Sequence, residues 1–270
     1  MTAEDIRAIA ERLVAARKSA SGLADFPGAI PPDLDTAYAI QDEMIAMWRR
    51  PVIGWKIGRV MPPLSERFGT LRLAGPIFAA PDGADPEMAI FADGSAAAET
   101  EFLLRIGTSP PEGQASFTLD EAIALIDAVH VGIEIASSPV KGLNALGPTA
   151  VTADFGNNNG LVIGPEVVDW RSLSFELWPV VTTIDGAEVG SGASSSLPGG
   201  VFEAARFLFE LMAGRGIALE PGQWISSGAI TGVHPVRPDQ RVEAIFRPDV
   251  CVSCRISAAT CEPADRVQQA

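Results

Sequence analysis

The chain has 270 residues, of which 47% are hydrophobic and 20% are charged. This length and composition are typical of a globular protein with one large domain, or with a small module and a main domain, and they argue against intrinsic disorder. The 34 acidic residues outnumber the 20 basic residues and give a net charge of -14. A surface of this sign repels phosphates, so the sequence predicts neither a nucleic-acid partner nor binding to an anionic membrane.

The N-terminus and the cysteines indicate a cytoplasmic protein. The first 20 residues are rich in charge and no run of 18 apolar residues occurs, so we expect neither a signal sequence nor a membrane-spanning segment. Cys251, Cys254 and Cys261 are odd in number and lie late in the chain, unlike a secreted disulfide framework. We interpret the C-x-x-C spacing of the first two as a reduced structural pair, because no second pair follows.

Residues 1–51 are predicted to form an N-terminal helical region. Thr2 and Asp5 have the spacing of a capping box, and an apolar stripe with helical periodicity follows them. Asp35 is expected to cap a second helix, which Pro51 ends.

From residue 52 onward, short segments typical of β-strands alternate with Gly, Pro, Asp and Asn. Asp185-Gly186 predicts a hairpin turn. The expected strands are Val52–Gly58, Ala97–Ile106, Val129–Ala136, Gly160–Gly164, Val180–Ile184, Trp224–Ile230, Val242–Phe246 and Val250–Ile256.

Two helices are expected to interrupt these strands. One is capped by Thr118 and Glu121 and carries an apolar stripe as far as Val129, and the other spans about Val201–Gly214. The predicted fold class is therefore α+β, with the helical region in residues 1–51 and a β-rich domain in residues 52–270.

Three carboxylates in apolar surroundings form the most informative pattern. Glu99 and Glu101 share one face if their segment is a strand, and two adjacent carboxylates repel each other unless a cation lies between them. Glu134 lies within the apolar segment Val129–Ala136, where an unpaired buried carboxylate is costly. Together they would provide oxygen ligands for Mg²⁺ or Mn²⁺, whereas a solvated strand edge is the more common explanation of each motif alone.

Two further stretches are candidates for anion binding. Lys56 lies among apolar residues and glycines, where a desolvated ammonium would face an anion, although a surface lysine is the alternative. Near Gly228, glycines expose backbone N–H groups, and Ser227 and Thr231 add hydroxyls, which suits a carboxylate. A plain exit from a strand is the alternative here.

These motifs together resemble the fumarylacetoacetate hydrolase superfamily, and within it the 2-keto-4-pentenoate hydratases. The resemblance implies a β-rich roll or sandwich preceded by helices, usually in a homo-oligomer. Each motif is short, but their order and spacing are specific. In chain order the matching segments are Asp35–Gln41, Gly54–Gly58, Glu99–Glu101, Glu134, Gly160–Gly164 and Ser227–Gly232.

The resemblance also implies roles for individual residues. The implied ligands of Mg²⁺ or Mn²⁺ are Glu99, Glu101 and Glu134. The implied contacts to the substrate carboxylate are Ser227, Gly228 and Thr231. The resemblance places a lysine near the metal, here Lys56, but it does not identify the residue that transfers the proton. The candidates for that role are, in falling order, Lys56, His130 and Asp154.

The implied reaction is the addition of water to a 2-hydroxy-2,4-dienoate, which gives a 4-hydroxy-2-oxo acid in the catabolism of aromatic compounds. Decarboxylation of a 2-oxo-3-enedioate of the 4-oxalocrotonate type, C–C hydrolysis of an acylpyruvate, and non-catalytic binding of an oxo acid are the alternatives. Hydrolases of the family often use a histidine from an N-terminal loop, and no histidine precedes His130. The segments Arg59–Pro63 and Asp154–Asn159 depart from the hydratase pattern, which leaves the precise substrate open.

Overall fold

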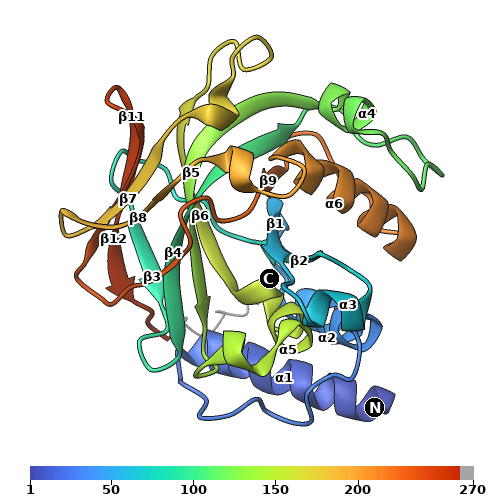
Figure 1. Cartoon of the computed structure of the whole chain (residues 1–270). Coiled ribbons are helices and arrows are strands. Elements are labelled where there is room, and N and C mark those ends of the chain that lie inside the picture. Colours follow the sequence, from blue (N-terminus) through green and yellow to red (C-terminus); the bar gives the residue numbers. More distant parts are fainter. Residues whose placement is uncertain (262–270) are drawn as a thin grey trace, which may run out of the picture.

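The computed structural model describes residues 1–261, so the end of the predicted β-rich domain, residues 262–270, lies outside the described residues. Helices gather around two β-sheets (Figure 1). The helices are α1 (Ala3–Ser19), α2 (Leu34–Trp48), α3 (Leu64–Phe68), α4 (Leu119–Ala124), α5 (Pro148–Ala153) and α6 (Phe202–Arg215).

The described strands form one larger and one smaller sheet. In spatial order, the larger contains β2 (Arg72–Ile77), β1 (Gly54–Arg59), β9 (Trp224–Ser226), β4 (Ser95–Ile106), β5 (Ile126–Ser138) and β6 (Asn158–Glu166), and β10 (Val233–Pro235) also pairs with β4. The smaller contains β3 (Glu87–Ile90), β12 (Val250–Ala258), β11 (Arg241–Arg247), β7 (Val180–Ile184) and β8 (Ala187–Gly192). The predicted α+β class is confirmed.

Local capping signals account for where the helices begin. In α1, the Thr2 hydroxyl accepts from the Asp5 N–H at 3.1 Å, and the Asp5 carboxylate accepts from the Thr2 N–H at 2.9 Å, so the predicted capping box is present. Helix α2 is capped by Asp33 rather than by Asp35, because the Asp33 side chain accepts from the Thr36 N–H at 2.8 Å.

The helix that begins at Thr118 is shorter than predicted. Its capping box with Glu121 is present, but α4 ends at Ala124 and β5 begins at Ile126. The stripe predicted to run to Val129 was therefore wrong, because the apolar residues after Ala124 belong to a strand. Short apolar runs fit both periodicities, and here pairing with β4 decides the structure.

The two faces of β4 have different environments, as the alternation of its side chains requires. One face packs against the smaller sheet, where the Phe102 ring centroid lies 4.9 Å from that of Phe246 and Thr100 hydrogen-bonds to Thr182. The opposite face carries Glu99 and Glu101. Their carboxylates therefore lie on the side of the larger sheet that faces away from the smaller sheet.

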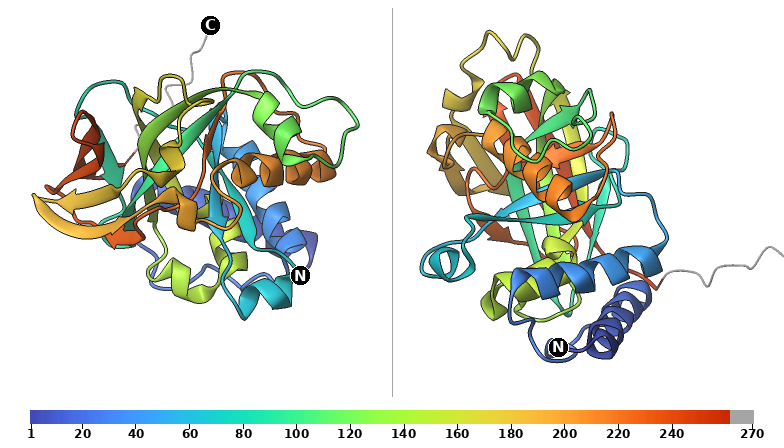
Figure 2. Two further views of the ribbon diagram at one scale, coloured as in Figure 1. Left: turned by 45° about the horizontal axis from the view of Figure 1, so that its top comes forward. Right: turned by 90° about the vertical axis from the view of Figure 1, so that its right-hand side faces the viewer.

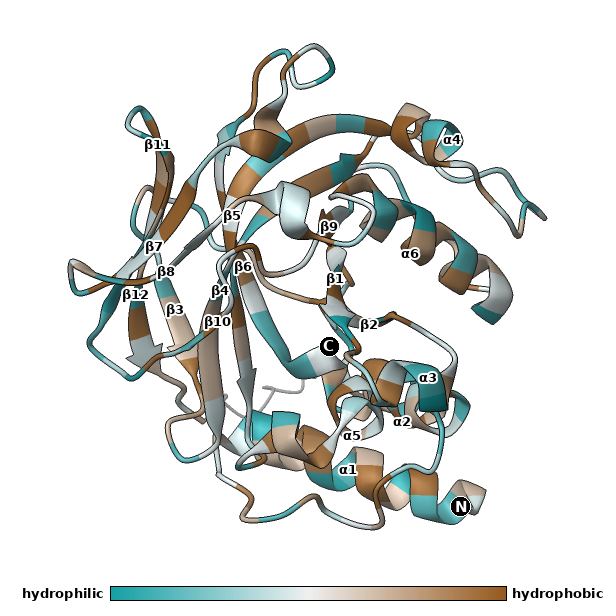
Figure 3. Cartoon of the chain, in the orientation of Figure 1, coloured by the Kyte–Doolittle hydropathy of each residue, from teal (hydrophilic) through white to brown (hydrophobic). Residues whose placement is uncertain are grey.

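Helices α1 and α2 lie at one end of the sheets, next to α5 (Figures 1 and 2). Figure 3 shows hydrophobic and hydrophilic stretches alternating along α1, as expected of a helix with one buried side. These helices share an apolar cluster with α5 and with Phe155 of the short 3₁₀ turn η2 (Phe155–Asn157). Within residues 1–261, the structure contains no helix with the length and apolar character needed to cross a bilayer.

Candidate metal centre

The structure brings the three glutamates together at the centre of the larger sheet. Strands β4 and β5 are antiparallel, and their register places Glu99 directly opposite Glu134, with Glu101 two residues further along β4. One carboxylate oxygen from each residue lies within 4.8 Å of the others. Glu101 and Glu134 are fully buried and Glu99 is 7% exposed, so water screens their mutual repulsion poorly.

A buried lysine lies beside this cluster. Lys56 in β1 is 4% exposed, and its Nζ is 3.3 Å from Oε1 of Glu134. The strand order explains this approach, because only the short strand β9 separates β1 from β4. When all four groups are ionised, the cluster has more negative than positive charge, which is costly at this depth.

The pKa shifts show how the protein without a cation would respond to this imbalance. Burial raises the pKa of Glu99 to about 7, with Lys56 opposing the rise and Glu134 adding to it. Burial, followed by repulsion from Glu134 and Glu99, raises the pKa of Glu101 well above its ordinary value. Burial alone would lower the pKa of Lys56, but the three carboxylates together outweigh it and raise this pKa.

Two carboxylate oxygens in the cluster have no hydrogen-bond partner among the described residues. Glu101 Oε2 accepts from the Ser226 hydroxyl and from the Gly228 N–H at 2.8 Å, and Glu134 Oε1 accepts from Asn158 Nδ2 at 3.0 Å. Oε1 of Glu101 and Oε2 of Glu134 are buried without a partner. Buried polar atoms are rarely left in this state, and hard oxygen ligands suit Mg²⁺ or Mn²⁺. The residues present therefore fit a divalent cation.

The cluster opens into a cavity of about 410 Å³, large enough for a small organic acid. Lys56 and Glu99 reach its wall, and the other polar side chains on the wall are Arg59, Asn144 and Asn157. Most of the remaining lining is apolar. Among these residues are Ile57, Val60, Met61, Leu64, Leu73, Val151, Ala229 and Val233.

Comparisons with known proteins identify relatives in sequence and in fold. A 2-keto-4-pentenoate hydratase from Paraburkholderia xenovorans (strain LB400) is 27% identical over 249 residues, which cover 88% of this chain and 90% of that protein. A 4-oxalocrotonate decarboxylase from Pseudomonas putida G7, complexed with magnesium and adipate, has a TM-score of 0.80 at 21% identity and covers 95% of this chain and 98% of its own.

A fumarylpyruvate hydrolase from Pseudomonas aeruginosa, in complex with Mn²⁺ and pyruvate, has a TM-score of 0.55 at 16% identity. It covers 76% of this chain and 89% of its own. No family model matches the chain. The likeness to solved structures shows the fold, and the sequence similarity to the hydratase extends along most of the chain. The chain is therefore similar in sequence to 2-keto-4-pentenoate hydratases, and it shares its fold with solved structures that include a fumarylacetoacetate hydrolase family protein.

The residues of the loop after β9 lie in two different environments. The Gly228 N–H supports Glu101, and the Ser227 hydroxyl is buried without a hydrogen-bond partner among the described residues. The Thr231 hydroxyl lies 2.7 Å from that of Thr182 and 3.0 Å from His234 Nε2. It thus belongs to a polar chain between the sheets rather than to the cavity lining.

The structure does not bring His130 or Asp154 into the carboxylate cluster. His130 Nδ1 lies 2.8 Å from the Gly164 carbonyl oxygen, and its ring packs edge-on against Trp224 with a centroid distance of 5.0 Å. Asp154 is buried and forms an ion pair with Arg17 at 2.6 Å. These contacts give both side chains structural partners, and Lys56 is the only one of the three predicted proton-transfer candidates that lines the cavity.

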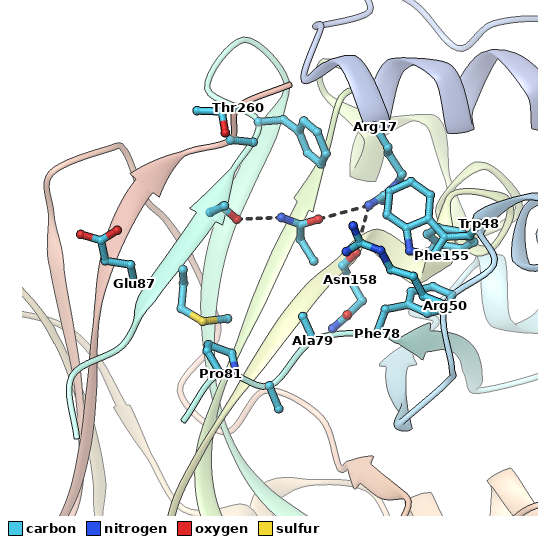
Figure 4. A pocket seen from close by; sticks show the side chains of 16 residues that line it. Arg17, Trp48, Arg50, Phe78, Ala79, Pro81, Glu87, Phe155, Asn158 and Thr260 are labelled. Atoms are coloured by element: carbon cyan, nitrogen blue, oxygen red, sulfur yellow. Dashed lines mark hydrogen bonds between the residues drawn. The ribbon is translucent and has the colours of Figure 1, made fainter. Parts of the chain in front are cut away.

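A second cavity, of about 520 Å³, lies on the other side of the segment that follows α5 (Figure 4). Phe155 and Asn158 line this cavity, whereas Gly156 and Asn157 between them line the first. The second cavity contains none of the three glutamates. The chemistry of the cluster therefore belongs to the smaller cavity, and the segment forms a shared wall.

Sequence reasoning missed the residues that support the cluster. Asn158 belongs to the segment noted only for its departure from the family pattern, and Ser226 directly precedes the predicted Ser227. A signal was available for Ser226, because it lies two residues before Gly228 of the glycine loop, and residues two apart in a strand share a face. The sequence contains no local signal that connects Asn158 to Glu134.

The cysteine pair has no part in this centre. Cys251 is exposed and Cys254 is buried, as expected for residues three apart on strand β12, which point to opposite faces. Burial raises the pKa of the Cys254 thiol to about 12. A neutral buried thiol is inert, which agrees with its interpretation as structural.

Proposed function

We propose that this protein is a metal-dependent hydratase, with Mg²⁺ or Mn²⁺ as cofactor, that adds water to a 2-hydroxy-2,4-dienoate. The observation that carries the proposal is the buried set of three carboxylates beside Lys56 at the wall of an organic-acid-sized cavity. Three ionised carboxylates, a divalent cation and the Lys56 ammonium are together neutral. A substrate carboxylate can therefore enter this site without meeting a net negative charge.

The proposed ligands of the cation are Glu99, Glu101 and Glu134. A bound divalent cation supplies Lewis acidity toward the oxygen atoms of a 2-oxo acid. Without a bound cation, the three carboxylates raise the pKa of Lys56, so its ammonium is charged at neutral pH and can donate a hydrogen bond. It stabilises negative charge that develops on the 2-oxygen, which is the position where fixed donors contribute most to catalysis.

The reaction proceeds in two proton-balanced stages. The substrate first loses its 2-hydroxyl proton and gains a proton at C5, which yields a 2-oxo acid conjugated with a C3–C4 double bond. Water then adds its hydroxyl at C4 and a proton at C3, which yields the 4-hydroxy-2-oxo acid. The apolar lining of the cavity suits the hydrocarbon end of such a substrate.

The 27% identity to a hydratase over most of the chain supports this assignment. It also supports a place in the catabolism of aromatic compounds, where such dienoates arise by ring opening. A homo-oligomeric state, a cytoplasmic location, and Ser227 and Gly228 as substrate contacts are parts of the same proposal. Light scattering tests the oligomeric state.

Decarboxylation of a 2-oxo-3-enedioate is the second candidate function. The specific observation in its favour is the titratable lining of the cavity, which in the described chain consists of Lys56, Arg59 and Glu99. Among residues 1–261, no separate histidine or carboxylate lines the cavity to activate water, and decarboxylation requires no such group. Arg59 would meet the second carboxylate of the substrate, and the decarboxylase fold neighbour is consistent with this reaction.

Turnover assays distinguish these functions. Purified protein with Mn²⁺ is given a 2-hydroxy-2,4-dienoate, a 2-oxo-3-enedioate and an acylpyruvate, and each assay is repeated with excess chelator. We expect loss of the dienoate and formation of a 4-hydroxy-2-oxo acid only when metal is present. Metal-dependent release of CO₂ would select the decarboxylase, pyruvate formation would select the hydrolase, and tight oxalate binding without turnover would indicate an oxo-acid-binding protein.

A further inference from the structure

Each fully buried glutamate of the cluster has one occupied oxygen and one open oxygen. In Glu101, hydrogen bonds occupy Oε2 while Oε1 has no partner. In Glu134, Lys56 and Asn158 occupy Oε1 while Oε2 has no partner. The donors around the cluster therefore assign one oxygen of each carboxylate to the protein and leave the other for a cation. Such outer contacts fix the orientation of metal ligands in proteins.

Asn158 reaches Glu134 because of an irregularity in the sheet. Strands β5 and β6 pair with Glu134 opposite Leu161 and Ala136 opposite Asn158, so β6 has one residue more than β5 in this interval. Such a bulge changes the direction of a side chain, and bulges are frequent beside active sites. Here it allows Asn158, the first residue of β6, to turn its amide toward the carboxylate.

The orientation of the Asn158 amide is determined at both ends. Its Oδ1 accepts a hydrogen bond from the Gly160 N–H at 3.0 Å, so the oxygen has to face the backbone. Its Nδ2 then faces Glu134 and donates to Oε1 at 3.0 Å. A donor at this position cannot be exchanged for an acceptor by a simple flip of the amide, because Gly160 would lose its partner.

The backbone of Asn158 is in turn held by a residue from the N-terminal helix. The guanidinium of Arg17 in α1 donates to the Asn158 carbonyl oxygen at 3.2 Å and to that of Ser137 in β5 at 3.3 Å. Arg17 is 4% exposed and forms the ion pair with Asp154. Figure 4 shows Arg17 and Asn158 near each other at the second cavity. Helix α1 therefore fixes both strands that carry the pair of Glu134 and Asn158.

We propose that Asn158, held by Arg17, is a positioning residue that directs one oxygen of Glu134 toward the divalent cation. This inference rests on the proposed metal site. Without the amide, only the Lys56 ammonium still contacts Oε1 of Glu134, so the orientation of this carboxylate is less firmly fixed and its open oxygen is less well placed for the ion. The loss of one such outer contact typically weakens metal affinity about 10- to 100-fold.

The test measures Mn²⁺ binding by titration calorimetry, without any substrate. Asn158→Ser retains an acceptor near Gly160 but is too short to reach Glu134, and Asn158→Ala removes both contacts. Asn159→Ser is the matched control, because the Asn159 amide donates to the Ala89 carbonyl oxygen and makes no contact with the carboxylates. Glu101→Gln provides the reference for a disabled metal site.

We expect the Kd for Mn²⁺ to rise about 10- to 100-fold in both Asn158 variants and to change less than about 3-fold in Asn159→Ser. The electron paramagnetic resonance spectrum of bound Mn²⁺ should also change in the Asn158 variants, because the ligand geometry changes. A purely structural role would alter the unfolding midpoint in chelator but leave the affinity and the spectrum of the folded protein unchanged.

The outcomes separate the two proposals. If the wild type and Glu101→Gln bind Mn²⁺ alike, the proposed metal site is wrong. If the wild type binds Mn²⁺, Glu101→Gln does not, and the Asn158 variants bind as the wild type does, the metal site stands and the positioning role is rejected. If neither Asn158 variant folds, as judged by near-ultraviolet circular dichroism, Asn158 serves the fold and the inference is likewise rejected.

Discussion

Replacement of Glu101 by glutamine should leave the metal-free protein at least as stable as the wild type, but should make the protein less stable than the wild type when metal is present. The substitution keeps the size of the side chain, and the amide oxygen can still accept from Ser226 and Gly228. It removes one negative charge from a cluster in which the ligand oxygens lie within 4.8 Å of one another. At that distance, each like-charge pair costs about 3 kcal/mol at an effective dielectric constant of about 20.

The expected gain in metal-free stability therefore lies between two limits. The gain is about zero where the Glu101 carboxyl already holds a proton, as its raised pKa favours. It approaches about 3 kcal/mol at a pH high enough to ionise the carboxyl, because attraction to Lys56 offsets part of the repulsion from Glu134 and Glu99. In chelator, Glu101→Gln should consequently be at least as stable as the wild type, which is unusual for a substitution at a fully buried position.

Added metal should make the wild type the more stable protein at a pH where the Glu101 carboxyl of the metal-free protein holds its proton. A Mn²⁺ concentration about 100 times the Kd stabilises a protein that binds only in its folded state by about 3 kcal/mol. The wild type should gain this amount and Glu101→Gln almost none, and metal-dependent activity should fall more than about 100-fold.

Denaturant unfolding in EDTA and in Mn²⁺, with the exposed Glu188→Gln as a control, measures both orders. The reasoning is refuted if Glu101→Gln is destabilised by more than about 1 kcal/mol in EDTA, or if Mn²⁺ stabilises it as much as the wild type.

Two further predictions concern the same cluster, and a third concerns the buried thiol of Cys254. Lys56→Met should lower turnover by about 100- to 1,000-fold. The affinity for Mn²⁺ should stay equal or increase, because the substitution removes the ammonium that lies beside Glu134. Lys141→Met on the surface is the kinetic control. The free energy of unfolding of the metal-free protein should fall by up to about 3 kcal/mol as the pH rises from 4.5 to about 7, because Glu99 holds its proton to higher pH when folded than when unfolded. Urea titrations at several pH values measure this dependence, and a free energy of unfolding that rises with pH would contradict it. Cys254→Ser should leave turnover unchanged and cost about 1–3 kcal/mol for a buried hydroxyl, whereas an inactive but folded variant would show that the thiol takes part in catalysis.

The sequence predicts the interior strands well because their signal is local. Period-two alternation places Glu99 and Glu101 on one face, and the structure shows this arrangement in β4. Of the strands that sequence reasoning missed, β2, β3 and β8 lie at the outer edges of the two sheets, and the short β10 pairs with β4. An edge strand needs only one partner and tolerates glycine and proline, as Gly75-Pro76 in β2 illustrates. These three edge strands lack the apolar run by which the interior strands, and β6 at the opposite edge of the larger sheet, are found.

The geometry of the site depends on pairings that no local pattern specifies. The register that places Glu134 opposite Glu99 is set along the whole length of β4 and β5, across a connection that contains α4. The link from Arg17 to Asn158 joins residues 141 positions apart. Sequence reasoning could therefore identify the acidic ligands by their unusual surroundings, but it could not identify the donors that orient them.

The architecture of β4 makes protonation or cation binding the two available ways to relieve the charge in the cluster. The carboxylates cannot turn to solvent by a rotation of the strand, because the opposite face is fixed by Phe102 against Phe246 and by the hydrogen bond between Thr100 and Thr182. Such a rotation would expose the apolar side chains of the main core, at about 25 cal/mol for each Å². Uptake of a divalent cation must then be accompanied by release of the protons that Glu99 and Glu101 hold in its absence, so metal affinity increases with pH in the range where those carboxyls ionise.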